Sequence, residues 1–287
     1  MKEYFKLLRV HQYIKNLFIF LPMFFALKIT DLDLLLDTFI AFISFSLTAS
    51  AVYILNDYHD IEEDRKHKKK KYRPLAANTV SKKEAIVLMI SLFLLGFIIM
   101  FSFSFYSTIL LFIYIIMNIA YSFFLKHVAI LDIVIIAIGF IIRLFIGSFI
   151  SNVHLSKWIV IMTFLLALFL ALAKRRDDVL IFMDTGEKTR KVIDGYNLKF
   201  LDISMSIMAS VVIVAYISYT ASIEATQRFN SQYLYLTALF VILGILRYLQ
   251  ITFVLKNSGS PTQIVLKDRF IQITLIFWLI TFFWILY

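Results

Sequence analysis

Cysteine is absent from the 287 residues of the chain, and proline occurs only three times. Without cysteine, the chain can form neither disulfides nor a thiolate metal site. Charged residues are scarce at 17%, whereas hydrophobic residues make up 61% and include thirty phenylalanines. A soluble domain is usually about half apolar, because polar groups must cover its surface. The composition therefore predicts long apolar helices immersed in lipid.

Nine apolar stretches have the length that crosses the hydrocarbon core of a bilayer, about 16 to 22 residues. Continuous apolar runs of this length in lipid are helices. The stretches are Ile14–Ile29, Thr38–Leu55, Ala85–Phe103, Thr108–Leu125, Ile133–Ile150, Trp158–Ala173, Leu201–Thr220, Leu234–Leu255 and Phe270–Tyr287. The first is short and carries Lys15, Asn16 and Pro22. We predict an all-α, polytopic membrane protein with nine transmembrane helices that form one catalytic domain over residues 1–287.

Positive charge is concentrated on one side of this nine-helix arrangement. The net charge is +10, and 24 of the 27 lysines and arginines near helix ends lie in the N-terminal segment and in every second loop. The opposite side has only Lys28, Lys157 and Arg228. Because basic loops stay in the cytoplasm, we predict a multi-pass protein of the inner (plasma) membrane with a cytoplasmic N-terminus and an external C-terminus.

The first of two long cytoplasmic loops, Asn56–Glu84, opens with an acidic run. Asp57, Asp60 and Asp64 are spaced i, i+3 and i+7, so all three fall within roughly 60° of one face if the preceding helix continues. Like charges on one stripe repel unless a cation lies among them. Oxygen ligands without cysteine suit Mg²⁺, which also bridges to substrate phosphates. The alternative is a solvated helix end that carries charges of both signs.

A basic run follows in the same loop, from Lys68 to Lys71, with Arg73 close behind. Lysines at this place fit topology determination and contact with anionic lipid headgroups, and we assign that role to Lys68–Lys70. Acidic ligands for a metal beside cations for phosphate oxygens are what diphosphate chemistry needs. The loop as a whole therefore indicates a site for a phosphorylated substrate.

The second long loop, Lys174–Phe200, opens with three cations followed by two acids. Cations at the C-terminal end of a helix satisfy the helix macrodipole and the positive-inside rule. That explanation accounts for one or two of them. It does not account for Asp178, which lies four residues after Lys174 and on the same face.

Arg143 lies deep within the fifth apolar stretch. It is 11 residues past Asp132, which places it about 16 Å along the helix axis and close to three turns on, so both side chains share one face. An ionisable group buried in lipid is expensive and is a functional candidate by default. A structural tie to a neighbouring helix explains it equally well, and both interpretations stay open.

The pattern Asn-Asp-x-x-Asp-x-x-x-Asp over Asn56–Asp64, with Arg73–Pro74 behind it, resembles the first acidic motif of the UbiA-type intramembrane prenyltransferase superfamily. Within that superfamily the chain is most similar to the decaprenyl-phosphate phosphoribosyltransferases. The further marks are Leu8-Arg9, Lys15-Asn16, Tyr121-Ser122 with Lys126, Asp132 to Arg143, Lys174-Arg175 with Asp178, Arg190 with Tyr196, and Arg247-Tyr248 with Asp268-Arg269. Asp178 replaces the Glu usual in that subfamily, and Asn78 stands near a usual Gly, a difference to which we attach little consequence.

The resemblance implies a nine-helix UbiA-like bundle and a Mg²⁺-dependent reaction, in which a polyprenyl phosphate attacks C1 of 5-phosphoribosyl diphosphate and pyrophosphate leaves. Enzymes of the superfamily that use a prenyl diphosphate typically carry a second Asp-x-x-x-Asp motif after the sixth helix, and no such spacing occurs between Lys174 and Phe200. One acidic cluster and one mostly basic cluster suit a single Mg²⁺-diphosphate and a second phosphate without a metal. The acceptor oxygen is already anionic, so no strong general base is needed.

The site residues follow from the same resemblance. Those implied as catalytic are Asp57, Asp60, Asp64, Lys174 and Asp178, and the first three are also the implied Mg²⁺ ligands. Those implied to bind substrate are Lys15, Asn16, Asn56, Arg65, Lys71, Arg73, Tyr121, Lys126, Arg143, Arg175, Arg190 and Tyr196. The expected partners are phosphoribosyl diphosphate, polyprenyl phosphate and membrane lipid, without nucleic acid, and association into homo-oligomers is left open.

Two other functions compete with this one. The first is a UbiA-type prenyltransferase that moves a prenyl group from a prenyl diphosphate to an aromatic or other small acceptor. The second is a transporter or lipid-binding scaffold without catalysis. Transporters place buried charges and broken helices near the midplane of the bilayer, whereas the ionisable groups of this chain gather at one face.

Overall fold

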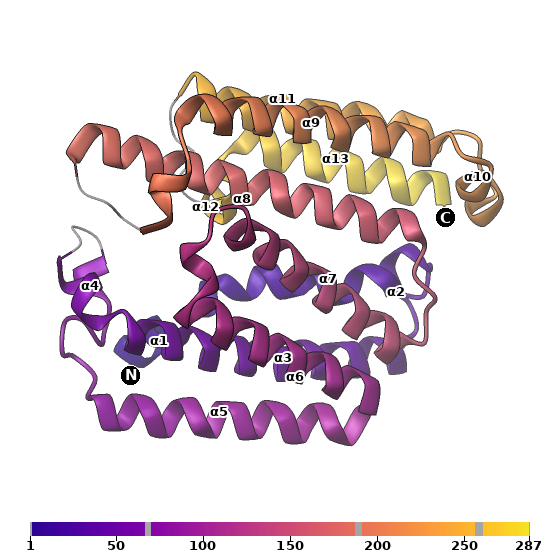
Figure 1. Cartoon of the computed structure of the whole chain (residues 1–287). Helices are drawn as coiled ribbons and strands as arrows, with labels where there is room; N and C mark the ends of the chain where they lie inside the picture. The colour runs from indigo at the N-terminus through magenta and orange to yellow at the C-terminus, as the bar shows by residue number, and fades with distance from the viewer. Residues whose placement is uncertain (1, 67–69, 187–190, 256–260, 287) are drawn as a thin grey trace. The chain divides into compact units, whose positions relative to one another are not determined.

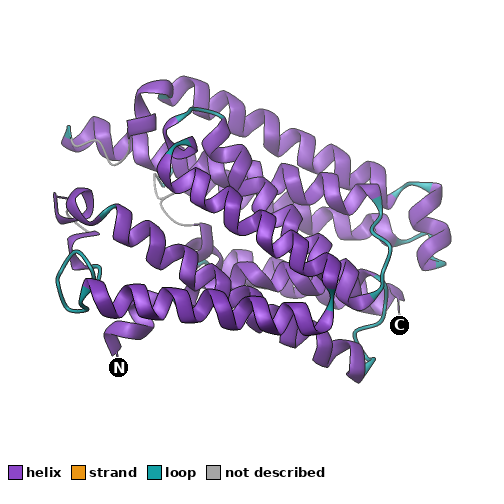
Figure 2. Cartoon of the chain, turned by 60° about the horizontal axis from the view of Figure 1, so that its bottom comes forward, coloured by secondary structure: helices purple, strands orange, loops and turns teal. Residues whose placement is uncertain are grey.

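The computed structural model describes residues 2–66, 70–186, 191–255 and 261–286, and these residues form helices and loops without any strand (Figure 2). The all-α prediction is confirmed. The chain divides into two compact units, Met1–Ser156 and Lys157–Tyr287. That residues 1–287 form one catalytic domain stays a prediction.

The first unit is built around one long helix, α3. Its elements, drawn from indigo to magenta in Figure 1, are α1 (Lys2–Leu8), η1 (Val10–Phe20), α2 (Leu21–Phe25), α3 (Leu32–His59), α4 (Ile61–Lys66), η2 (Lys70–Tyr72), α5 (Lys82–Phe103), α6 (Phe105–Phe123), η3 (Leu125–His127) and α7 (Leu131–Ser151). Helix α3 packs against α5, α6, α7 and η1. It carries small residues where it meets α5: Ser44 donates to the Gly96 carbonyl at 2.6 Å, and a Cβ at Gly96 would overlap the Thr48 hydroxyl. Such small residues let helices approach closely in lipid.

The second unit contains the remaining helices. They are α8 (Lys157–Thr185), η4 (Lys191–Gly195), α9 (Leu198–Thr220), α10 (Ile223–Phe229), η5 (Leu234–Thr237), α11 (Ala238–Phe253), α12 (Pro261–Lys267) and α13 (Arg269–Leu286). Helix α8 packs against α9, and α11 packs against α9 and α13. Between α12 and α13 the chain bends by 80°. Asp268 stabilises this bend, because it accepts from the Ile271 amide at 3.0 Å and pairs with Arg247 of α11 at 2.8 Å.

Seven helices in the described part of the chain are long and apolar enough to cross a membrane, or eight if α12 and α13 together count as one span. They cover the predicted apolar stretches from Thr38–Leu55 onward, so a multi-pass membrane fold is confirmed. The nine-helix count is not confirmed, because the first predicted span, Ile14–Ile29, does not form one long helix. Its 3₁₀ segment runs to Phe20, and a five-residue α-helix with Pro22 in its first turn follows.

Candidate active site

The acidic run begins in the last turn of α3 and continues past its end. Helix α3 stops at His59, Asp60 is its C-cap with φ −94° and ψ 10°, and α4 begins at Ile61. The condition for three carboxylates on one helical face, that the helix continues through Asp64, is therefore not met. Carboxylates oppose the macrodipole at the C-terminal end of a helix, and here the chain turns at the second of the three.

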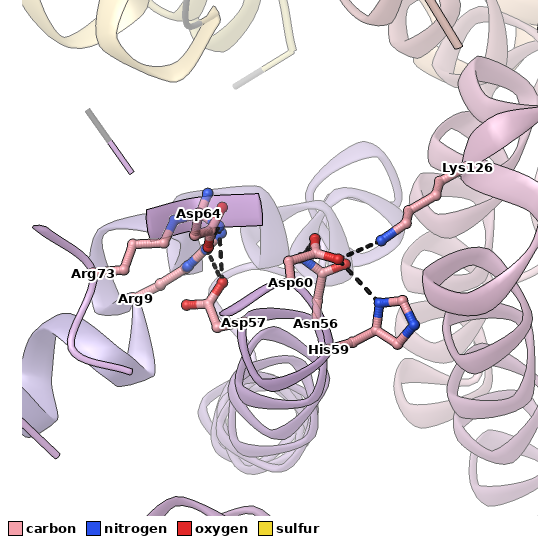
Figure 3. Close-up of polar contacts among 8 residues, drawn as sticks. All are labelled: Arg9, Asn56, Asp57, His59, Asp60, Asp64, Arg73 and Lys126. Carbon is pink, nitrogen blue, oxygen red and sulfur yellow. Dashed lines mark hydrogen bonds and ion pairs between the residues drawn. The ribbon is translucent and has the colours of Figure 1, made fainter. Parts of the chain in front are cut away.

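Asp57 and Asp64 share one arginine, Arg73, and Asp57 also meets Arg9 (Figure 3). Both carboxyl groups are 2% exposed. Arg73 donates to Asp64 at 2.6 Å and to Asp57 at 3.1 Å, and Arg9 of the N-terminal segment donates to Asp57. Arg9 has a left-handed backbone with φ 52° at the junction of α1 and η1, and its guanidinium also lies over the Tyr53 ring.

Asp60 points away from that pair, toward Lys126 of η3 (Figure 3). Lys126 donates to it at 2.6 Å, the Asn56 amide donates at 3.2 Å, and the ring of His59 lies 3.1 Å away. Burial acts to raise the pKa of Asp60, but the hydrogen bonds from Lys126 and His59 and the positive charge of Lys126 outweigh it, so this pKa lies below its usual range. Asp60 is therefore ionised at neutral pH.

The carboxylate oxygens are of the kind that Mg²⁺ prefers, and the pair formed by Asp57 and Asp64 supplies as many carboxylates as a Mg²⁺ site usually has. Mg²⁺ is usually bound through one or two carboxylates together with waters and substrate phosphates, and Asp57 and Asp64 supply two carboxylates that meet at Arg73. Among the residues that the structure describes, no three acidic or histidine side chains converge closely enough to hold a metal. Asp60, on the opposite side, is the one that does not join the other two.

Of the other predicted residues of this loop, Arg65 is hydrogen-bonded within the loop and Lys71 is exposed. Arg65 bridges the loop beyond η2, donating to the Ala76 carbonyl at 3.2 Å and to the Asn78 side chain at 2.8 Å. Asn78 itself is left-handed, with φ 56°, a conformation that favours Gly and tolerates Asn. This backbone conformation gives a physical reason for the Gly that is usual near this position, and that the difference has little consequence stays a prediction. Lys71 is exposed, and its ammonium lies over the Tyr72 ring.

Arg143 of α7 is the centre of a second, buried polar cluster in the first unit. It is 5% exposed and donates to Asn16 at 2.8 Å, to the Gly139 carbonyl at 2.7 Å and to the Tyr114 hydroxyl at 3.4 Å. The rings of three aromatic residues surround its guanidinium: Phe45, Tyr114 and Phe140. Asn16 donates in turn to Ser46 of α3. The cluster thus ties η1, α3, α6 and α7 together.

Two further residues predicted to bind substrate lie in the first unit. Lys15, next to Asn16, is half-buried, as is Tyr121 in the C-terminal part of α6.

In the second unit, the predicted residues lie along the C-terminal half of α8. Arg175, 1% exposed, donates to Asp178 at 2.5 Å, and Lys174 beside it is half-buried. Tyr196 is buried, and its ring contacts Phe200. Arg190, which we predicted to bind substrate, lies outside the described residues.

Sequence reasoning missed two arginines. Arg9 entered only as part of the resemblance, although it contacts Asp57, because nothing local indicates that a residue 48 positions away is its partner. Arg176 was read as part of a basic run. It is 5% exposed, pairs with Asp202 of α9 at 2.6 Å and donates to the Thr252 carbonyl of α11 at 2.9 Å.

A multi-pass helical fold with acids and cations paired beside the end of a long helix suits an enzyme that works within a membrane. The chain belongs to the UbiA prenyltransferase family, whose sequence model matches residues 17–280. It is therefore an enzyme, a transferase of that family, and the resemblance noted from its motifs is confirmed.

Curated relatives match almost the whole chain. The chain is 30% identical over 284 residues to the decaprenyl-phosphate phosphoribosyltransferase of Mycolicibacterium smegmatis, covering 96% of this chain and 89% of that protein. The enzyme of the same name from Mycobacterium tuberculosis is 28% identical, with 96% and 91% covered. A UbiA homolog from Archaeoglobus fulgidus, solved with DMAPP and Mg²⁺, is similar in fold, with a TM-score of 0.72, 18% identity and 96% of each chain covered.

Proposed function

We propose that the chain transfers a 5-phosphoribosyl group from 5-phosphoribosyl diphosphate to a polyprenyl phosphate. An anionic oxygen of the lipid phosphate forms a new bond to C1 of the ribose. The bond from C1 to the diphosphate oxygen breaks, and pyrophosphate leaves with the electron pair. Two whole-length relatives named as phosphoribosyltransferases support this reaction over the other activities of the family.

The observation that carries the proposal is the pairing of each acid at the end of α3 with a cation. Asp57 pairs with Arg9 and Arg73, Asp64 with Arg73, and Asp60 with Lys126. A metal-bound diphosphate presents both signs of charge to such a cluster. When bound to these acids, Mg²⁺ would neutralise the leaving diphosphate. Arg9, Arg73 and Lys126 would then donate to phosphate oxygens, as charge-assisted hydrogen bonds favour.

The residues of α8 suit the second phosphate of the reaction. Lys174 and Arg175 bring two cations to one helical turn, and the loop that follows has no second Asp-x-x-x-Asp motif. We assign them to a phosphate that carries no metal, either the ribose 5-phosphate or the lipid phosphate. Asp178, which accepts from Arg175, would orient that guanidinium.

Transfer is tested by offering the purified full chain 5-phosphoribosyl diphosphate labelled in the ribose, together with a polyprenyl phosphate and Mg²⁺. We expect label to pass into a lipid-soluble product, with pyrophosphate released in equal amount. The prenyltransferase alternative is offered in parallel as a prenyl diphosphate with an aromatic acceptor. Transfer of the prenyl group without any ribosyl lipid would overturn the proposal.

We further propose the nine-helix topology in the inner membrane, with the N-terminus and the basic loops in the cytoplasm. Because the chain has no cysteine, single cysteines can be labelled from either side without background. Tyr4→Cys and Lys83→Cys should react only from the cytoplasmic side, and Gln227→Cys only from outside. Labelling of Tyr4→Cys and Lys83→Cys from opposite sides would contradict the count of nine.

A further inference from the structure

Two side-chain hydroxyls on α11 are buried without a hydrogen-bond partner among the residues that the structure describes: those of Tyr248 and Thr252. Tyr248 is 4% exposed and Thr252 is fully buried. Their spacing of four residues places them one turn apart on the same face of the helix. Buried hydroxyls are normally hydrogen-bonded, and each exception calls for an explanation.

Other threonine and tyrosine hydroxyls of the described helices do have hydrogen-bond partners. A helical threonine readily donates to the carbonyl four residues before it, as Thr108, Thr220 and Thr274 do at 2.8, 3.0 and 2.8 Å. Thr252 does not. The hydroxyl of Tyr216, in the same unit, meets both the Thr237 hydroxyl and the indole nitrogen of Trp278, each at 2.8 Å. The hydroxyl of Tyr248 meets neither kind of group.

Tyr248 and Thr252 both contact the part of α8 that leads into the proposed phosphate-binding residues. The ring of Tyr248 contacts the ring of Phe169 at 5.3 Å between centroids. Two turns further along α8, Arg176 donates to the backbone carbonyl of Thr252 at 2.9 Å. Arg175, the next residue, is one of the cations that we assign to a phosphate. The hydroxyls and this cation therefore belong to the same end of the second unit.

We propose that Tyr248 and Thr252 hydrogen-bond the sugar-phosphate part of the donor, an inference that rests on the proposed phosphoribosyl transfer. A pentose phosphate offers hydroxyl and phosphate oxygens that satisfy both side chains. A prenyl chain offers none and would leave them unpaired. Sites built from buried polar groups reject an analogue that lacks the matching polar group much more strongly than apolar pockets reject a small change in shape. The pair therefore selects a phosphoribosyl donor over a prenyl donor.

The test uses the full chain in detergent, with ribose 5-phosphate as an unreactive probe and with the isosteric variants Tyr248→Phe and Thr252→Val. Each variant should raise the Kd for ribose 5-phosphate about tenfold, the loss of one hydrogen bond. Neither should lower the melting temperature, because each removes a buried hydroxyl that has no partner in the free protein. A purely structural role would not produce this combination of weaker binding and undiminished stability.

Tyr216→Phe is the matched control, since it removes a tyrosine hydroxyl that is hydrogen-bonded in the same unit. We expect its melting temperature to fall by about 2–4 °C and its Kd for ribose 5-phosphate to stay unchanged. Unchanged binding of ribose 5-phosphate by both α11 variants would overturn the inference. So would variants that weaken the binding of a polyprenyl phosphate alone while ribose 5-phosphate binds as before.

Failure of the proposed function has a different result. If the wild-type chain neither binds ribose 5-phosphate nor transfers label from phosphoribosyl diphosphate, then the donor itself is wrong. The other case is that the wild type binds ribose 5-phosphate and transfers label, and that Tyr248→Phe and Thr252→Val have the same Kd for ribose 5-phosphate and the same KM for phosphoribosyl diphosphate. Then only the role of the two hydroxyls is wrong.

Discussion

The ion pairs at the end of α3 and the Arg175–Asp178 pair of α8 differ in how far apart in the sequence their partners lie. Arg9 and Asp57 are 48 positions apart, and Lys126 and Asp60 are 66 apart. Arg175 and Asp178 are three apart on one helix. A pair within a helix forms with that helix, whereas a pair between distant segments forms only after the helices pack. Removing a charge near α3 should thus disturb both chemistry and packing, whereas removing the charge of Arg175 should disturb chiefly chemistry.

The sharpest test of this difference is removal of the acids near α3. Asp57→Asn and Asp64→Asn should each lower the transfer rate about 1,000-fold, the upper range for losing one preorganised electrostatic contact. They should also lower the melting temperature, because Arg73 stays half-buried with one carboxylate fewer. Transfer assays with and without EDTA, together with thermal unfolding, measure both effects.

Glu63→Gln is the control for the acid variants, since it removes an exposed carboxylate from the same acidic run. It should leave the rate and the melting temperature unchanged. Full activity of the wild type in EDTA would refute the metal ligation that we propose for Asp57, Asp60 and Asp64.

On α8 the effect of removing Lys174 or Arg175 should fall chiefly on substrate binding. Lys174→Ala and Arg175→Ala should each weaken binding by about 2–3 kcal/mol, the scale of a charge-assisted hydrogen bond, and this would raise KM. Thermal unfolding should change less than in Asp57→Asn. A larger loss of stability than of affinity in both variants would erase the distinction between the two regions.

Arg143 tests the first unit away from its acids. Arg143→Gln should lower stability by about 1–3 kcal/mol, because Asn16 and Tyr114 would lose a buried partner, and KM for both substrates should stay the same. Denaturation and steady-state kinetics on the same preparation separate the two effects. Unchanged stability with a raised KM would assign Arg143 to the substrate instead of to the packing of η1 and α7.

The smallest expected effect is that of pH on the Asp60–Lys126 pair. The pKa of Asp60 is lower in the folded protein than its usual value, so the stabilisation is present above the unfolded pKa of about 3.9. It is lost as the pH falls through the lower, folded value. The difference in melting temperature between the wild type and Lys126→Met should therefore be constant from pH 7.5 to pH 5 and shrink below about pH 4. A difference that shrinks between pH 7.5 and pH 5 would show that another group titrates.

The long apolar helices could be predicted from the sequence because their signal is local. Ala85–Phe103 was predicted and α5 ends at Phe103, since a continuous, mostly apolar stretch of this length forms a helix in lipid. The break at Asp60 and the 80° bend before Arg269 could not be predicted, because distant side chains stabilise both. Lys126 holds Asp60, and Arg247 holds Asp268.

The candidate site was predictable in its residue types but not in its pairs. The spacing of Asp57, Asp60 and Asp64 identified the acids, and the basic run identified Arg73. Which acid meets which cation depends on how the helices pack, and no periodicity encodes that. For the same reason the sequence left two roles open for Arg143, whereas its contacts with Asn16 and Tyr114 are plain in the fold.

The left-handed backbone of Arg9 limits what this position can become. A glycine there would adopt φ 52° without steric cost, but Asp57 would lose one of its two cations. Asn would tolerate this conformation but lose the charge, and most other uncharged residues would keep the backbone strain, of order 1 kcal/mol, and lose the charge as well. The charge beside the buried Asp57 favours Arg at this position, whereas the left-handed backbone favours Gly. Replacing Arg9 by Gly would therefore relieve the backbone strain only at the cost of the ion pair.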